Sequence, residues 1–171
     1  MKLIGLDLAT RFGWAIWAPG EPVRYGSVRL PSAPHISIGD RYLRYANWLA
    51  QRIKDERPAK VYFEAPWVGP NTHQNTARFL MGLASSTHLI CAKAGVIPVE
   101  ANNQTTRKQF LGAANRTMRA DKKAAVMSAC RLRGWEPKNN DEGDALAVLE
   151  YAATQERLKL DWGIPILGGG A

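Results

Sequence analysis

The chain has 171 residues, of which 46% are hydrophobic and 22% are charged, and its formal net charge is +8. This length is typical of one domain with a single core, and the composition excludes a largely disordered chain. No apolar run approaches the roughly 20 residues that a membrane-spanning helix needs, so we expect a soluble, cytoplasmic protein. Cys91 and Cys130 lie in apolar helical stretches without metal-ligand spacing, and both are expected to be reduced core residues.

The first part of the chain predicts three strands, at about 2–8, 13–18 and 23–30. Turn signals separate them at Arg11-Phe12-Gly13 and Pro19-Gly20-Glu21-Pro22, so the strands are expected to form an antiparallel meander. Ser37 can cap the next element, a helix with a broad apolar face that runs to about Glu56.

The middle of the chain alternates strand and helix, which implies parallel pairing of the strands. Val61 to Glu64 predicts a strand, a long helix follows over about 74–94 and ends at Gly95, and Val96 to Glu100 predicts the last strand. The remainder is helical, with segments at about 104–111, 120–133 and 141–158.

Together these elements predict an α/β fold with a mixed five-stranded sheet, in which an antiparallel meander joins parallel strands and helices flank the sheet. The sequence contains no internal repeat and no domain linker. Residues 1–158 are therefore expected to form a single domain, and residues 159–171 a flexible C-terminal tail.

Four acidic residues occupy settings that surface carboxylates seldom occupy. Asp7 and Glu64 end apolar strands, and parallel pairing of those strands would place the two carboxylates close together. Asp141 and Asp144 are three residues apart before an apolar helical run, so both should project from one face of a helix. Like charges gathered in this way repel one another unless a cation joins them. Oxygen-only sites suit Mg²⁺ or Mn²⁺, and paired ions of this kind support phosphodiester hydrolysis.

Structural explanations exist for some of these acids. Asp141 would be favourable at a helix N-terminus capped by Asn139 or Asn140, and Asp7 could form an Asx-turn. Glu64 has no evident helix or turn role. The coincidence of all four residues favours a catalytic site.

Positive charge is concentrated between Thr105 and Arg133, where eight basic residues and one acid, Asp121, account for +7 of the net charge. A solvated helix face would intersperse both signs, so we interpret this band as a surface for a phosphate backbone. Trp67 lies in a loop rich in proline and glycine and is interpreted as a base-stacking residue. His73, close to the predicted site, is a candidate phosphate contact or proton shuttle.

The two ends of the chain resemble the RuvC-type Holliday junction resolvases. The segment from Gly5 to Ala15 resembles their first-strand motif, and the segment from Asp141 to Ala147 resembles their last-helix motif. Glu64 stands where these enzymes have their second acid. The resemblance covers residues 1 to about 157. It implies a ribonuclease H-like fold, a homodimer, and Mg²⁺-dependent paired nicking of four-way DNA junctions with two ions per active site.

The resemblance also implies roles for individual residues. Asp7, Glu64, Asp141 and Asp144 match the catalytic acids that bind the metal. Trp67 matches an aromatic residue that stacks on unpaired bases near the crossover. Lys108, and one of the adjacent lysines in the basic band, match basic residues near the scissile phosphate and the backbone. With that band, the expected DNA-binding residues are Trp67, Arg107, Lys108, Arg116, Arg119, Lys122 and Lys123.

The first motif departs from the family in one respect. Familiar bacterial members continue with Pro-Gly after the first aspartate, whereas this chain has Leu8-Ala9. The difference indicates a divergent or phage-like branch, acting in a bacterium or in a phage-infected cell.

The predicted helix near 74–94 bears on assembly, because its apolar residues spread around much of its circumference. Such a helix is buried on more than one side. One side can pack on the sheet, while Gly82, Ser85 and Ser86 permit close approach of a second copy; full burial inside a monomer is the alternative. A two-fold dimer would set two active sites against two strands of a two-fold junction.

The sequence therefore predicts a structure-selective endonuclease that resolves four-way junctions. One alternative is a broader branched-DNA or flap endonuclease of the same fold, and another is a catalytically silent junction-binding protein. A kinase-type phosphotransferase is disfavoured, because the chain has neither a second comparable domain nor an adenosine-binding glycine motif.

Overall fold

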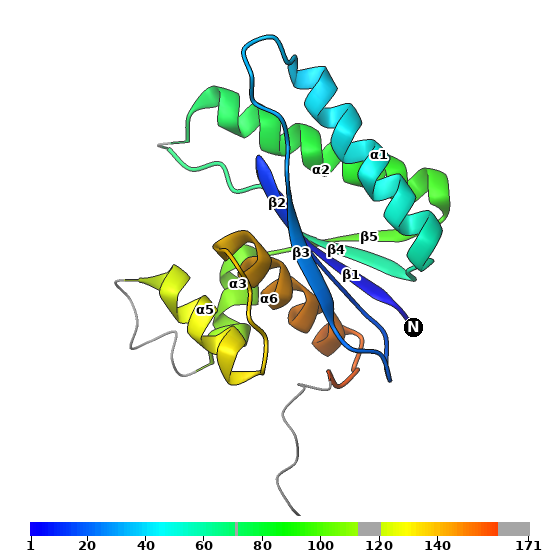
Figure 1. The fold of residues 1–171 in the computed structure, drawn as a ribbon, viewed down its shortest axis with the longest axis vertical. Helices are drawn as coiled ribbons and strands as arrows, with labels where there is room; N and C mark the ends of the chain where they lie inside the picture. Colours follow the sequence, from blue (N-terminus) through cyan, green and yellow to red (C-terminus); the bar gives the residue numbers. More distant parts are fainter. Residues whose placement is uncertain (71, 113–120, 161–171) are drawn as a thin grey trace, which may run out of the picture.

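Figure 1 shows the computed structural model of the chain, which describes residues 1–70, 72–112 and 121–160. A five-stranded sheet with strand order β3-β2-β1-β4-β5 crosses the middle of the molecule. The strands are β1 (Leu3–Asp7), β2 (Arg11–Trp17), β3 (Arg24–Arg29), β4 (Lys60–Glu64) and β5 (Ile97–Ala101). The helices are α1 (Ile38–Glu56), α2 (Gln74–Ala94), α3 (Asn103–Leu111), α5 (Lys122–Leu132) and α6 (Asn140–Gln155).

The strand pairing confirms the predicted mixed sheet. β1 pairs with β2 and β2 with β3 in antiparallel fashion, whereas β1 pairs with β4 and β4 with β5 in parallel. The register sets Leu6 beside Phe63, so the two parallel strands β1 and β4 end next to each other at one edge of the sheet.

The sheet separates two hydrophobic cores. Helices α1 and α2 cover one face, and α3, α5 and α6 cover the other (Figure 1). Successive side chains of a strand point to opposite faces. Thus β1 supplies Ile4 and Leu6 to the core under α1 and α2, and Leu3 to the core under α6. The same alternation directs Gly5 and Asp7 toward α6.

The ends of α1 and α2 follow from local sequence signals. Ser37 caps α1 as predicted, because its Oγ accepts a hydrogen bond from Asp40 N at 3.1 Å while Asp40 Oδ2 accepts one from Ser37 N at 3.0 Å. Helix α2 ends at the predicted Gly95, whose φ of 68° lies in the left-handed region. His73 caps the start of α2, with Nδ1 accepting from Asn75 N at 3.3 Å.

The contacts of Gly82 on α2 correct one expectation about assembly. A Cβ on Gly82 would lie 2.2 Å from the ring of Tyr42 on α1. Tyr42 in turn stacks on Phe79 of α2, with ring centroids 5.6 Å apart. Gly82 therefore makes room for a contact within the chain, and the expectation that it makes room for a second copy is wrong.

The turn predicted at Arg11-Phe12-Gly13 is also wrong, because β2 already begins at Arg11. Phe12 is fully buried in the core under α1 and α2. Gly13 faces the other way, and a Cβ there would lie 1.8 Å from the carbonyl oxygen of Asp141 on α6. The glycine is needed for close packing, and the chain reverses over residues 8–10 instead.

The last helix is shorter than predicted and ends at Gln155. Arg157 adopts the left-handed conformation with a φ of 57°, and Leu158 N donates to Ala153 O at 2.8 Å. This turn brings Leu158 back against the core under α6. Most of the predicted flexible tail, residues 161–171, lies outside the described residues.

Both cysteines lie in the core, as predicted, with free thiols. Burial raises the pKa of Cys91 to about 11 and that of Cys130 to about 12. Within residues 1–70, 72–112 and 121–160, no helix is both long enough and apolar enough to cross a membrane.

Candidate active site

The four acids singled out from the sequence come together at one edge of the sheet. Asp7 ends β1, and Glu64 ends the neighbouring parallel strand β4. Asp7 is only 8% exposed, and the charge of Glu64 acts on its carboxyl group. Asp141 and Asp144, at the start of α6, are close enough for their charges to act on Asp7. Their assignment as metal ligands stays a prediction.

Two glycines allow α6 to reach this edge. A Cβ on Gly5 of β1 would lie 2.7 Å from Leu149 N, and one on Gly13 of β2 would lie 1.8 Å from Asp141 O. Both contacts are with helix backbone, which cannot yield as a flexible side chain would. The absence of a side chain at these two positions therefore places the acidic start of α6 against the end of β1.

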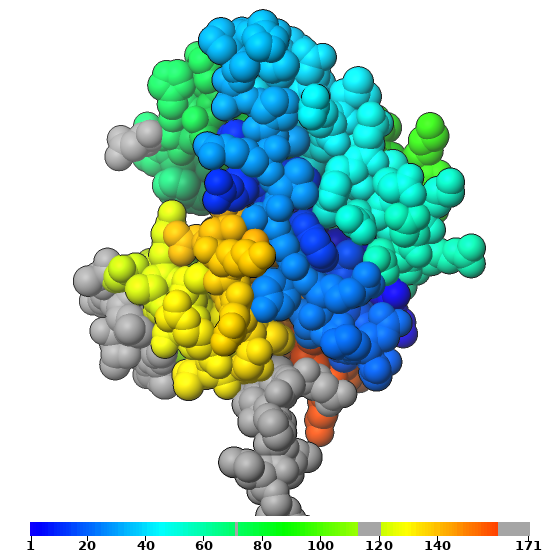
Figure 2. All heavy atoms as spheres, in the orientation of Figure 1, coloured from blue at the N-terminus to red at the C-terminus, as the bar shows by residue number. Residues whose placement is uncertain are grey.

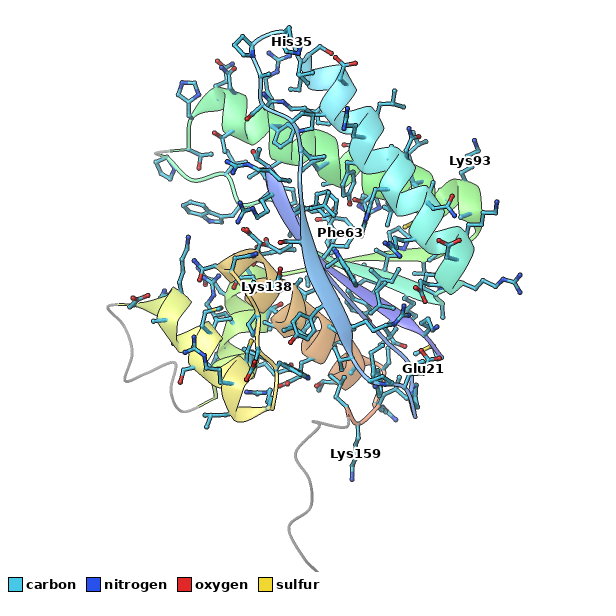
Figure 3. All side chains as sticks on the ribbon, viewed as in Figure 1. Glu21, His35, Phe63, Lys93, Lys138 and Lys159 are labelled. Carbon is cyan, nitrogen blue, oxygen red and sulfur yellow. The ribbon has the colours of Figure 1, made fainter. Side chains whose placement is uncertain are left out.

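Glu142, which lies between the two aspartates, has a structural role. It is 5% exposed, and its carboxylate accepts hydrogen bonds from Ser27 Oγ at 3.0 Å, Lys138 N at 2.7 Å and Asn139 Nδ2 at 3.1 Å. Asn139, one of the two predicted caps, accepts from Glu142 N at 3.1 Å. Figure 3 labels Lys138 at this start of α6, and Figure 2 shows the same segment in orange at the surface, next to α5 in yellow.

Burial and mutual repulsion perturb the ionisation of the acids. Burial raises the pKa of Asp7 well above its usual range, and the charges of Glu64 and Asp144 raise it further. Burial also raises the pKa values of Glu64, Asp141 and Asp144. Burial is the largest cause for both Asp7 and Glu64, and the two carboxyl groups titrate as an interacting pair. A bound cation would relieve this repulsion.

Three basic side chains surround the acids. Arg107 Nη2 lies 3.3 Å from Asp144 Oδ1, and its charge works against burial by lowering the pKa of Asp144. Lys123 lowers the pKa values of Asp144 and Asp141, and its role near the scissile phosphate stays a prediction. Arg11 also acts on Asp141. Sequence reasoning misses Arg11, although its position four residues after Asp7 was an available signal.

The donor set fits a magnesium or manganese ion in type, because all four groups offer carboxylate oxygens. As they stand, no three His, Cys, Asp or Glu side chains of the described segments are close enough to hold an ion. Arg107 forms an ion pair with Asp144, and the charges of the other three acids raise the pKa of Asp7. A bound ion would offset the repulsion among the acids and would compete with Arg107 for Asp144.

Trp67 lies in the loop after β4 and is 66% exposed. Ala65 N donates to Ala101 O at 2.9 Å, which ties the start of this loop to β5. The indole covers Gly69, where a Cβ would lie 1.9 Å from Trp67 Cη2. Trp67 and Glu64 line one pocket of about 160 Å³, so the exposed ring adjoins the acids.

The predicted basic band divides into separate groups. Lys108 and Lys122 are exposed, as a phosphate-binding surface requires. Arg133 instead forms an ion pair with Glu150, with 2.6 Å between Nε and Oε2, and lies over the ring of Phe110. It therefore stabilises the packing of α5 on α6. The predicted DNA-binding residues Arg116 and Arg119 lie outside the described residues.

Comparison with known protein sequences gives one informative relative. No family model matches the chain. The sequence is 28% identical over 163 residues to the crossover junction endodeoxyribonuclease RuvC of Protochlamydia amoebophila (strain UWE25), and the match covers 92% of this chain and 93% of that protein. The similarity therefore spans nearly the whole of both proteins.

Solved structures of Holliday junction resolvases also match the chain. Thermus thermophilus RuvC matches with a TM-score of 0.69 and 21% identity, covering 92% of this chain and 96% of that chain. T. thermophilus RuvC in complex with Holliday junction substrate gives a TM-score of 0.70 and 19% identity, covering 92% and 95%. The yeast mitochondrial Holliday junction resolvase Ydc2 matches with a TM-score of 0.60 and 9% identity, covering 85% of this chain and 75% of that chain. The resemblance predicted from the two end motifs is confirmed: the chain is similar in sequence to a RuvC over nearly its whole length, and it has the ribonuclease H-like fold of the solved RuvC structures.

Proposed function

We propose that this protein is a structure-selective DNA endonuclease that resolves four-way junctions by metal-dependent hydrolysis of phosphodiester bonds. The observation that carries the proposal is the group of four buried or half-buried carboxylates, Asp7, Glu64, Asp141 and Asp144, with basic side chains around it. The end-to-end similarity to a crossover junction endodeoxyribonuclease supports it. Such a substrate implies a site of action in the cytoplasm of a bacterial or phage-infected cell.

We assign two Mg²⁺ ions per active site to the four acids, with Mn²⁺ as a substitute. Bound ions of this kind supply an activated water nucleophile and stabilise the leaving oxygen of a phosphodiester. The residues of the chain prepare the site for them. Asp7 must be ionised to become a ligand, and a bound cation would favour its charged form. Burial strengthens every electrostatic interaction at this edge of the sheet.

The basic residues divide the work of holding the DNA. Arg11, Arg107 and Lys123 lie near the acids and are proposed to contact the phosphate that is cut. Lys108 and Lys122 are exposed and are proposed to contact the backbone farther away. Arg116 and Arg119 belong to the same proposed surface by sequence.

Selection of branched DNA is assigned to Trp67. An exposed indole beside a nuclease site cannot stack on bases that are already paired and stacked in a duplex. Unpaired bases at a crossover offer it a free face, and such stacking contributes about 1–3 kcal/mol per base. Trp67 would therefore favour junctions over plain duplex.

Assembly as a homodimer through α2 is the remaining part of the proposal. The buried side of α2 packs on α1 and the sheet, but Met81 and Leu89 are 49% and 72% exposed. Leu89 also lines a groove of about 470 Å³ between α1 and α2, with Ala46, Ala50 and Ile90. A two-fold axis on this side would give the two symmetric cuts that resolution requires.

The test compares four DNA substrates with the wild type and one variant. Labelled four-way, three-way, flap and duplex DNAs are incubated with Mg²⁺, and the nick positions are mapped. The wild type should cut four-way junctions at symmetric positions. Asp7→Asn should abolish cutting and keep junction binding, since it removes a ligand charge and little volume. Asp55→Asn, a change in an exposed acid of α1, is the matched control and should cut normally.

Each other outcome has a definite meaning. Cutting of three-way and flap DNAs at similar rates would favour the broader branched-DNA endonuclease. Junction binding by the wild type without metal-dependent cutting would favour the silent binding protein. Mg²⁺-dependent nicking retained by Asp7→Asn would overturn the assignment of the site.

A further inference from the structure

A small pocket adjoins the four acids. Its lining comes from the ends of β1 and β4, the loop after β4, α2 and α3, and consists of Leu8, Glu64, Ala65, Pro66, Trp67, Leu80 and Asn103. Its volume of about 160 Å³ is below the roughly 300–1,000 Å³ of typical small-molecule sites. A pocket of this size suits one planar group better than a whole nucleotide or a large cofactor.

The lining combines apolar and polar surface in about equal parts. Leu8, Pro66, Trp67 and Leu80 provide aliphatic and aromatic surface, which favours a flat ring. The carboxylate of Glu64 and the amide of Asn103 provide the polar groups, and Glu64 also belongs to the acidic site. A nucleobase in the pocket would therefore lie beside Glu64, next to the proposed site of cleavage.

Two adjacent asparagines differ in what they do. Asn102 is the N-cap of α3, and its Oδ1 accepts a hydrogen bond from Thr105 N at 3.1 Å. Asn103 is the first residue of the helix and lines the pocket. Within the described part of the chain, the Asn103 amide makes no hydrogen bond, so its donor and acceptor are available to a ligand.

We propose that this pocket receives one unpaired nucleobase next to the phosphate that is cut, and that Asn103 selects the base through its amide. The inference rests on the proposed function, because only a branched or opened DNA offers an unpaired base at little energetic expense. The apolar lining stacks on the ring, and the amide pairs a donor and an acceptor with the edge of the base. Asn103 is then a specificity-determining residue.

The experiment uses four-way junctions that are identical except for the bases on either side of the cut. Single-turnover cleavage rates of the full-length protein are measured for each base at each position. The wild type should discriminate between the best and the worst base at one position by about tenfold or more, as expected for one bidentate contact between an amide and a base. Asn103→Ala should reduce this ratio to within about twofold.

Gln104→Ala is the matched control, because it removes the same amide from an exposed position one residue along the helix. It should keep the wild-type base preference. Asn103→Ser is a second variant that suits the first turn of a helix, and it should lose the preference as the alanine variant does. Circular dichroism melting checks that all variants are folded.

The outcomes separate the inference from the function on which it rests. Failure of the wild type to cut any junction would refute the proposed function. If the wild type cuts all base variants equally, or if both Asn103 variants keep its preference, the role of the pocket is refuted while the nuclease function stands.

Discussion

Asp7 is the residue on which the candidate site depends most. It is nearly inaccessible to solvent, and the charges of the other three acids act on it. An acid whose folded-state pKa is raised destabilises the folded protein once the pH exceeds its ordinary pKa of about 3.9. Asp7 is therefore required for the proposed function, although it lowers the stability of the metal-free protein.

Asp7→Asn should stabilise the metal-free protein at neutral pH. The amide removes the buried charge and can donate a hydrogen bond to a neighbouring carboxylate, so we expect a gain on the order of 1 kcal/mol, the net contribution of a typical intramolecular hydrogen bond. The gain should appear above about pH 4 and vanish below it, because Asp7 is then protonated in both the folded and the unfolded state. Chemical denaturation in EDTA between pH 3 and 8 measures it.

Mg²⁺ should reverse the order of stability of the wild type and Asp7→Asn. An ion that binds only the folded state raises its stability in proportion to the logarithm of the ion concentration. The melting temperature of the wild type should rise with Mg²⁺ more than that of Asp7→Asn. Equal responses would mean that Asp7 is not a ligand.

Lys122 and Lys123 are adjacent in sequence but should differ in function. Lys123 acts on both aspartates of α6, so Lys123→Ala should slow cleavage roughly tenfold to hundredfold at saturating enzyme. Lys122→Ala should mainly weaken binding and flatten its salt dependence by about one phosphate contact. Single-turnover rates and binding titrations at several salt concentrations distinguish the two. Equal effects on the chemical step would contradict the assignment.

At the scale of elements, the packing of α6 on the sheet depends on the two glycines of β1 and β2. Gly13→Ala would set a Cβ against the backbone of Asp141, so the helix would have to move away. We expect a loss of at least about 2 kcal/mol in the free energy of unfolding, in the range for overpacked cores. The cleavage rate should fall further than the loss of folded protein explains, because Asp141 and Asp144 would move away from Asp7.

A matched control for this change is Gly39→Ala on α1. A Cβ at Gly39 would meet Ser37 Oγ at an ordinary distance of 3.5 Å. Alanine is also the better helix former, so this variant should be as stable as the wild type or slightly more stable. Urea unfolding curves and cleavage rates of both variants test the comparison. An unaffected Gly13→Ala would contradict the close approach of α6.

The sequence predicted the elements and the meeting of the acids because both depend on local patterns. Strand periodicity and parallel pairing suffice to place Asp7 beside Glu64. The role of Gly13 depends on a helix more than a hundred residues away, and its local signal resembles a turn. The partners of Arg107 and Arg133 likewise come from α6, and a run of basic residues does not reveal which of them are already paired.

At the scale of the molecule, the two faces of the sheet have different roles. Helices α3, α5 and α6, which carry two of the acids and the described basic residues, cover one face, and α2, which carries the proposed dimer contact, lies on the other face with α1 (Figure 1). Assembly can therefore be disturbed without touching the catalytic groups.

Leu89→Lys should separate assembly from chemistry. It places a charge on the exposed part of α2, so the protein should sediment as a monomer at micromolar concentration and cut only one strand of a junction at a time. Leu132→Lys is the control, because Leu132 is a similarly exposed leucine, 75% accessible, on α5. Sedimentation velocity and the ratio of paired to single nicks give the readouts. A wild type that is monomeric when bound to junctions would contradict the dimer.

The alternation of β1 makes the sheet a partition between two environments that are only one residue apart in the chain. Leu6 lies among the apolar side chains beneath α1 and α2, and Asp7, the next residue, lies among the charges beside α6. Deletion of a single residue within β1 would turn its side chains to the opposite faces of the sheet. The carboxylate would then enter the hydrophobic core under α1 and α2, and a leucine would face the acids. The spacing of this short strand is thus as strict a requirement for function as the identity of its aspartate.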